Sequence, residues 1–119
     1  MKIIYENKKA EKQCTNIKEA TKLFGGNKTL ALSLLSRIEA LKSAEVINDI
    51  RVIKPFRFHN LVGNYKGYFA IDVKSKTDKW RLIIQPLDED GNVFKPCNID
   101  EIASIVRTVK VKEISSHYE

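Results

Sequence analysis

Residues 68–85, YFAIDVKSKTDKWRLIIQ, decide the fold. Hydrophobic side chains alternate with others along residues 69–73 and again along residues 80–84. Successive side chains of a β-strand point to opposite faces of a sheet, so this alternation predicts two strands that each bury one face. The polar residues 75–78 between them can form the turn. The segment is therefore expected to be an antiparallel β-hairpin.

Two helices are expected before this hairpin. Asn16 is followed three residues later by Glu19, which is typical of a capped helix start, and the Gly-Gly pair at 25–26 ends this helix. Asn27 can cap a second helix with a hydrophobic stripe at helical spacing. The stripe is formed by Leu30, Leu34, Ile38 and Leu41. A short loop between two helices favours an antiparallel pair.

The remaining segments complete an α+β pattern. Residues 2–5 are apolar and predict a first strand, and Asp90-Gly91 is a turn signal. Asn98 is expected to cap a short helix through Ile105, and a last strand begins near Val109. This order predicts one domain, residues 1–119, with two N-terminal helices packed on one face of a mostly antiparallel sheet.

Composition narrows the class of protein. The chain has 119 residues, 43% of them hydrophobic, and it contains no apolar run long enough to span a bilayer. It has no export leader at Met1, and Cys14 and Cys97 are far apart, without His at metal-ligand spacing. We therefore expect a cytoplasmic protein with idle thiols, no metal site and no cofactor.

Positive charge is concentrated in the middle of the chain. Residues 51–81 contain eight Lys or Arg and two acids, Asp72 and Asp78, and this excess equals the +6 net charge of the whole chain. A localised positive field attracts polyanions, and nucleic acid is the commonest polyanion available to a small protein. The alternative is a solvated lysine-rich surface. Because the charge gathers around His and Tyr residues, nucleic acid is the favoured interpretation.

Pleating of the predicted strands places several polar side chains on one face. If residues 69, 71 and 73 point toward the helices, their neighbours point away from them. The side chains expected on this open face are Arg57, His59, Tyr68, Lys74 and Arg81. His117 and Tyr118 could reach the same surface, because the last strand must pair within this sheet.

This set of side chains suits metal-free cleavage of RNA. Attack of a ribose 2′-hydroxyl on the neighbouring phosphate needs a base, an acid and fixed positive charge. Imidazole titrates in the right range, and such proton transfer typically contributes about 10²–10⁴-fold. Arg81 would offer a planar fork for two phosphate oxygens. Tyr68 and Tyr118 could stack on a base or hydrogen-bond a phosphate.

Each of these residues also has a purely structural interpretation. His59 could be a hydrogen-bonded structural residue, and Arg81 could form a cross-strand ion pair with Asp72. Tyr68 could be an aromatic at the rim of the core, and His117 could lie in a frayed tail. The shared face is what favours the functional interpretation.

Residues 59–73, HNLVGNYKGYFAIDV, followed by Trp80-Arg81-Leu82, resemble the signature of HigB-type toxins in the RelE superfamily. Those proteins carry a His-x-Leu-x-Gly…Gly-Tyr-Trp…Trp-Arg pattern and end on a Tyr/His pair, which here is His117-Tyr118. The first half of the chain resembles the family only in its strand-helix-helix plan. The lysine that follows His-x-Leu in the family is Val62 in this chain, and Lys66 is the candidate substitute.

The resemblance implies a RelE-like fold with a small twisted sheet. It also implies a ribosome-dependent mRNA endonuclease of a type II toxin–antitoxin system, which inhibits translation and binds a HigA-like helix-turn-helix antitoxin in a hetero-oligomer. The candidate catalytic residues are Arg81, His59, His117 and Tyr118. The candidate RNA-binding residues are Arg57, Lys66, Tyr68, Lys74 and Lys79. The alternatives are a non-catalytic RNA- or ribosome-binding module and a protein that only forms complexes with another protein.

Overall fold

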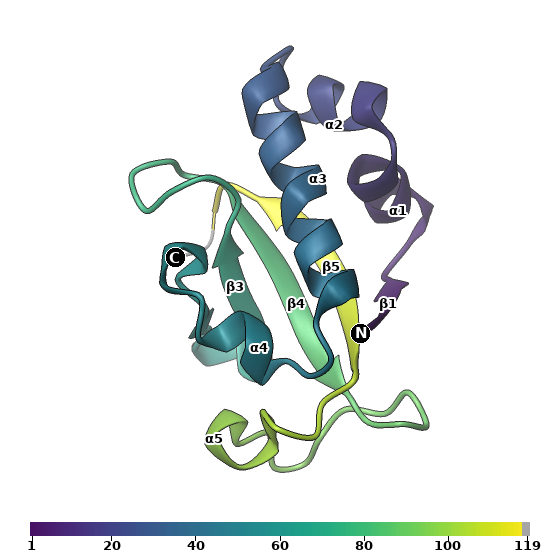
Figure 1. The fold of residues 1–119 in the computed structure, drawn as a ribbon, viewed down its shortest axis with the longest axis vertical. Coiled ribbons are helices and arrows are strands. Elements are labelled where there is room, and N and C mark those ends of the chain that lie inside the picture. Colours follow the sequence, from purple (N-terminus) through teal and green to yellow (C-terminus); the bar gives the residue numbers. More distant parts are fainter. Residues whose placement is uncertain (118–119) are drawn as a thin grey trace.

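A computed structural model describes residues 1–117, in which five β-strands form one open sheet in the order β1-β5-β4-β3-β2 (Figure 1). The strands are β1 (Lys2–Tyr5), β2 (His59–Asn60), β3 (Phe69–Asp72), β4 (Arg81–Leu87) and β5 (Thr108–Ser115). β1 runs parallel to β5, and the other neighbours are antiparallel. The sheet is therefore mixed, with its first and last strands side by side.

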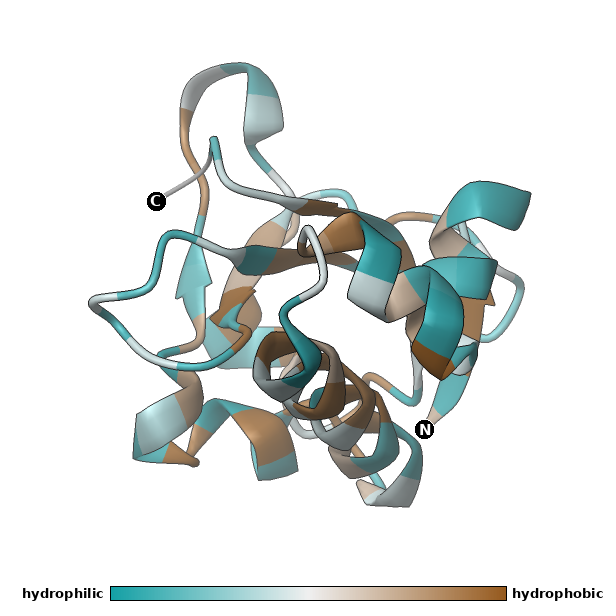
Figure 2. Ribbon diagram, turned by 90° about the horizontal axis from the view of Figure 1, so that it is seen from above, coloured by the Kyte–Doolittle hydropathy of each residue, from teal (hydrophilic) through white to brown (hydrophobic). Residues whose placement is uncertain are grey.

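Helices α1 (Lys8–Thr15), α2 (Ile17–Leu23), α3 (Lys28–Ser43) and α4 (Asn48–Arg51) lie on one face of this sheet, whereas α5 (Ile99–Ile102) lies beyond its lower end (Figures 1 and 2). Two 3₁₀ turns follow α4, at Lys54–Phe56 (η1) and Gly63–Tyr65 (η2). Asparagine side chains accept backbone N–H groups at four helix starts, each worth about 1 kcal/mol. These caps are Asn7, Asn16, Asn27 and Asn98.

The main core lies between α3 and the sheet. Leu34, Ile38 and Leu41 of α3 are fully buried in one cluster with Ile71 of β3 and Leu82 of β4. Figure 2 shows hydrophobic segments of α3 next to the strands. The stripe read from the sequence is thus the buried face of α3, and the hairpin strands supply the opposite wall.

The α+β class and the hairpin are confirmed, with some corrections in the helical part. Helices begin after Asn16 and Asn27 as expected, and Gly91 sits in a turn with a positive φ of 83°. The sequence analysis missed α1 and α4, so four α-helices rather than two precede the hairpin. α5 ends at Ile102, short of the expected Ile105, because residues 103–105 form a turn instead.

The two cysteines are free thiols, as expected. Burial raises the pKa of Cys14 to about 12, and it also raises the pKa of the half-buried Cys97. Both thiols are therefore protonated and poorly nucleophilic near neutral pH. Within residues 1–117, none of the helices is both long and apolar enough to cross a membrane.

Candidate functional site

The strand register builds two rows of side chains on the face of the sheet that the helices leave open. One row runs across four strands, because His59 pairs with Ala70, Ala70 with Ile83, and Ile83 with Glu113. Directly paired residues point to the same face, so His59 and Glu113 stand at the two ends of this row. At the usual strand spacing of about 4.8 Å, their Cα atoms lie about 14 Å apart.

The second row adjoins the first. Asp72 of β3 pairs with Arg81 of β4, and Arg81 pairs with Ser115 of β5. All three side chains are buried, with at most 5% of each residue exposed. At this end of the sheet, the charged side chains on the open face, Asp72 and Arg81, are therefore buried.

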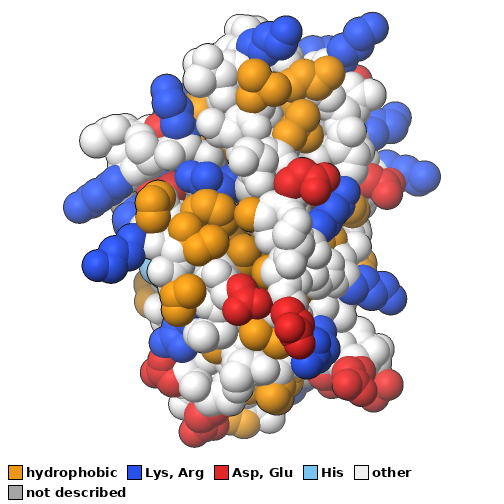
Figure 3. All heavy atoms as spheres, in the orientation of Figure 1, with side chains coloured by type: hydrophobic (Ala, Val, Ile, Leu, Met, Phe, Trp, Pro, Cys, Tyr) orange, Lys and Arg blue, Asp and Glu red, His pale blue; other side chains and the backbone are white. Residues whose placement is uncertain are grey.

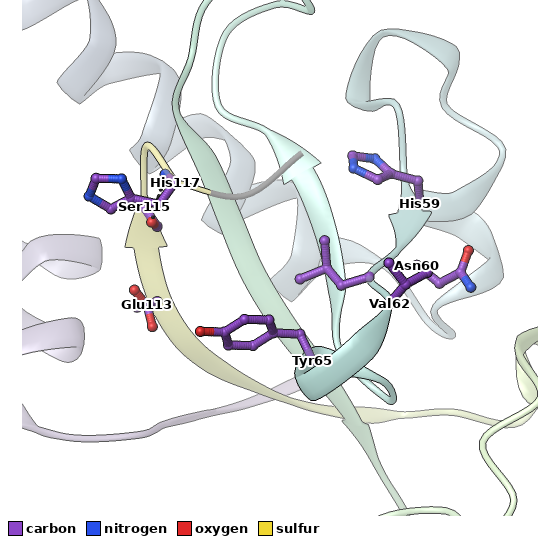
Figure 4. Close-up of a pocket in the computed structure, with 8 residues that line it drawn as sticks. His59, Asn60, Val62, Tyr65, Glu113, Ser115 and His117 are labelled. Carbon is purple, nitrogen blue, oxygen red and sulfur yellow. Dashed lines mark hydrogen bonds between the residues drawn. The ribbon is translucent and has the colours of Figure 1, made fainter.

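A cavity of about 470 Å³ opens over these rows (Figure 4). Its floor is the sheet, and its rim includes the segment from β2 to η2, whose Leu61 packs with Ala70 and Ile83 in a small second core. Its lining residues are His59, Asn60, Leu61, Val62, Tyr65, Glu113, Ser115 and His117. The cavity thus collects both histidines of the chain.

His59 is held in one tautomer by the backbone before it. Its Nδ1 lies 2.7 Å from the carbonyl oxygen of Arg57, and a carbonyl only accepts, so Nδ1 carries the proton. Nε2 of the neutral ring then has the lone pair that a general base needs. Nε2 is enclosed and has no hydrogen-bond partner among residues 1–117.

Arg57 itself has an unusual backbone conformation that directs this carbonyl. Its φ of 47° lies in the left-handed region, which costs a non-glycine residue about 1–2 kcal/mol. The Arg57 side chain is anchored, because its Nε donates to Oδ2 of Asp72 at 3.0 Å. We infer that this partly buried ion pair compensates for the strain and keeps the carbonyl directed at His59.

The tautomer of His59 is a testable consequence of this geometry. Two-bond ¹H–¹⁵N NMR spectra, recorded at a pH where the His59 ring is neutral, should show His59 protonated on Nδ1 and unprotonated on Nε2. Arg57→Gly should preserve this tautomer, since glycine adopts positive φ readily and keeps the carbonyl. A His59 ring protonated mainly on Nε2 in the unmodified protein would contradict the assignment.

His117 approaches the cavity from the opposite side. His117 is exposed, and its backbone N–H donates to Oγ of Ser115 at 3.0 Å, just after the end of β5, where the chain bends. In Figure 4 the rings of His59 and His117 lie at opposite ends of the site. The two imidazoles share a cavity without touching, and an RNA strand that joins them would have to bridge the cavity. Tyr118 lies outside the described residues.

Arg81 is on the expected face, but it is buried rather than presented to solvent, so the expectation of an open guanidinium fork is wrong. Its Nε lies 3.2 Å from Oδ1 of Asp72, an ion pair whose atoms are not aligned as a hydrogen bond. Its Nη1 donates to the carbonyls of Asp78 and Trp80, and its Nη2 donates to that of Lys76 at 3.2 Å. The cross-strand pair, considered as an alternative, is what forms.

The predicted RNA-binding residues fall into separate places. Tyr68 is half-buried in the second core, and the ammonium of Lys112 lies 5.5 Å from its ring centroid. Lys74 and Lys79 are exposed on the loop between β3 and β4, beyond the open face. Lys66 is exposed and lines a neighbouring hollow of about 340 Å³ instead of the histidine cavity. Val62, at the position of the family's lysine, lines the histidine cavity, whereas the lining of that cavity does not include Lys66.

Several residues of the cavity were not among the candidates from the sequence, and Glu113, Ser115 and Tyr65 are the ones with ionisable or hydroxyl groups. Glu113 has a 42% exposed side chain and an ion pair with Lys112 at 3.8 Å. Ser115 is buried, and Tyr65 is 38% exposed, with its hydroxyl directed toward Glu113 in Figure 4. Alternation along β5 could have placed Glu113, Ser115 and His117 on one face. The register shift opposite Ile83 and Ile84 of β4, however, moves Glu113 to the open face although Val111 points to the helix-covered face.

Among residues 1–117, no three His, Cys, Asp or Glu side chains gather closely enough to hold a metal ion. No protein-family model matches the chain, and a search of curated proteins finds no match. Function must therefore be argued from the site itself.

Proposed function

We propose that the protein is a RelE-like, ribosome-dependent mRNA endonuclease, the toxin of a type II toxin–antitoxin system. The observation that supports this most directly is the cavity on the helix-free face, which is lined by both His59 and His117. Two imidazoles can supply the base and the acid that 2′-hydroxyl attack on a phosphate requires, without a metal or cofactor. The sequence resemblance to HigB-type toxins covers the same residues.

His59 is the better-defined proton-transfer group, because its Nδ1 is fixed by the carbonyl of Arg57, which leaves the lone pair on Nε2. His117 is exposed, so it can rotate toward a bound phosphate, and Tyr118 stays a candidate for the same role. Of the two arginines that pair with Asp72, Arg57 is the more exposed, with a 33% exposed side chain. Arg81 would serve the site indirectly by holding Asp72.

Charge also favours an RNA substrate. Figure 3 shows Lys and Arg side chains at the left edge, around the loop between β3 and β4, and also along the top and right edges, whereas acidic side chains are most frequent at the lower end. A field of this polarity would guide a polyanion toward the basic part of the molecule, which includes the β3–β4 loop. The same charge would attract acidic residues of the proposed partner, a HigA-like helix-turn-helix antitoxin in a cytoplasmic hetero-oligomer.

A non-catalytic RNA- or ribosome-binding module is the second candidate. It is favoured by the engagement of Arg81 with Asp72 and by the enclosure of His59 Nε2. Binding needs the basic surface but no titrating group, so the two candidates differ in whether RNA is cut.

The first test is cleavage of mRNA in a programmed ribosome. The purified protein should cut the message within the ribosomal A site, as mapped by primer extension. Cutting should persist when hexaamminecobalt(III), which offers no exchangeable inner-sphere ligand, replaces free magnesium and sedimentation shows intact ribosomes. Binding without any cut would favour the non-catalytic module. Loss of cutting on intact ribosomes would instead indicate a metal-dependent step.

A further inference from the structure

The loop between β3 and β4, residues 73–80, is held to the protein by Arg81 from beneath. Arg81 donates to three carbonyl groups of this loop, those of Lys76, Asp78 and Trp80. The charge of Arg81 is also neutralised by the buried carboxylate of Asp72, so Arg81 has a structural role in this loop. A nine-tenths buried guanidinium with these partners fixes the path of the loop backbone.

A second arginine secures the start of the loop from the helical side. Nε of Arg37 in α3 donates to the carbonyl of Asp72 at 2.9 Å, and its Nη2 donates to that of Lys74 at 3.4 Å. The guanidinium of Arg37 is itself held over the ring of Phe56, 4.1 Å from the centroid. At the other end of the loop, Trp80 packs edge-on against Phe24, with ring centroids 5.0 Å apart. The loop is thus restrained at both ends.

What this restrained loop presents to solvent is positive charge. Lys74, Lys76 and Lys79 are all exposed, whereas the single acid, Asp78, turns its Oδ1 toward the backbone N–H of Trp80 at 2.9 Å. The hydroxyls of residues 75 and 77 lie 3.1 Å from each other beside these lysines. Lysine and hydroxyl side chains are the usual partners of phosphate oxygens.

We propose that this loop docks on the phosphate backbone of folded RNA, and that in the cell this RNA belongs to the ribosome. Residues 74–79 contain no aromatic side chain, so the loop cannot stack on the unpaired bases of a message. They contain no large apolar side chain either, which a protein partner would need for the centre of an interface. A pre-shaped basic loop binds backbone charge regardless of sequence.

The assignment deepens the proposed function by separating two contacts. The cavity around His59 would receive the single-stranded message, while the loop would hold the structured RNA around it. The identity of the RNA as ribosomal rests on the proposed function. The affinity of the loop for an RNA backbone does not rest on the proposed function, and it can be measured without any cleavage.

The experiment compares two triple variants of equal charge. Lys74→Ala, Lys76→Ala and Lys79→Ala are combined in one protein, and Lys8→Ala, Lys9→Ala and Lys12→Ala in the other, where the lysines are exposed on α1. Binding of a labelled short RNA duplex is measured by anisotropy between low and high salt. Replacing a lysine that contacts phosphate should reduce the magnitude of the slope of log K against log salt concentration by about one.

The loop variant is expected to lose about two to three units of slope, and the α1 variant less than one, with equal melting temperatures. Lys76→Ala alone should lose about one unit, which tests the proposal should the triple variant fold poorly. Equal losses in both triple variants would mean unspecific charge and would overturn the proposal. Unchanged RNA binding with weakened antitoxin binding would assign the loop to a protein partner. Duplex binding that depends on the loop, in a protein that never cuts mRNA, would support the docking surface and reject only the nuclease.

Discussion

Replacing Arg81 with alanine is expected to lower the free energy of unfolding by about 3–5 kcal/mol, because it leaves a buried carboxylate short of one partner. The side chain of Asp72 is 1% exposed and that of Arg81 is 6% exposed, so neither charge can be solvated in place. The variant also leaves the carbonyls of the β3–β4 loop without their donor. The same change at a solvent-exposed arginine would cost far less.

Urea unfolding of the wild type, Arg81→Ala and Arg107→Ala provides the measurement. Arg107 is the matched control, because it pairs with Glu45 at 3.4 Å while more than half of each side chain is exposed. Such surface pairs contribute about 0–1 kcal/mol. If Arg81→Ala is as stable as Arg107→Ala, the ion pair with Asp72 does not stabilise the fold. Cleavage by Arg81→Ala has meaning only at temperatures where the variant is folded.

Substitution of His59 by asparagine is expected to reduce single-turnover cleavage by about 10²–10⁴-fold at saturating ribosome. Asparagine can still donate a hydrogen bond to the carbonyl of Arg57, so the fold should be preserved. It lacks the Nε2 lone pair and cannot transfer a proton. The melting temperature and ribosome binding should therefore stay close to the wild type while the rate falls.

The comparison for His59→Asn is the protein that lacks residues 117–119. This truncation should also detoxify the protein, and it should cost little stability because His117 is exposed. Full activity after truncation would leave His59 as the only imidazole in the site. Full activity of both variants would rule out imidazole catalysis and favour the non-catalytic module.

The alternation of hydrophobic side chains was sufficient to predict β3 and β4, because one face of each strand must be buried. It also placed His59 and Arg81 on the correct face of the sheet. The asparagine caps located α2, α3 and α5 for an equally local reason. Features that depend on neighbouring residues along the chain were therefore accessible from the sequence.

Features that depend on distant residues were not. Whether the guanidinium of Arg81 is exposed or buried depends on Asp72 and on the loop carbonyls that surround it in the folded protein. Glu113 became part of the cavity only through the pairing of β5 with β4, whose register contains a bulge. The left-handed backbone of Arg57, which orients His59, has no signal in the sequence because glycine is the residue usually found there.

The parallel pairing of β1 with β5 has a consequence for when the protein becomes complete during its synthesis. β1 can pair in full only after the chain has been made through Val111, since Lys2 pairs with Thr108 and Tyr5 with Val111. Such distant contacts form late, because the entropy of closing a long loop must be met first. The nascent chain lacks the strand that carries Glu113, and with it one wall of the cavity. The cavity is therefore complete only once almost the whole chain has been synthesised.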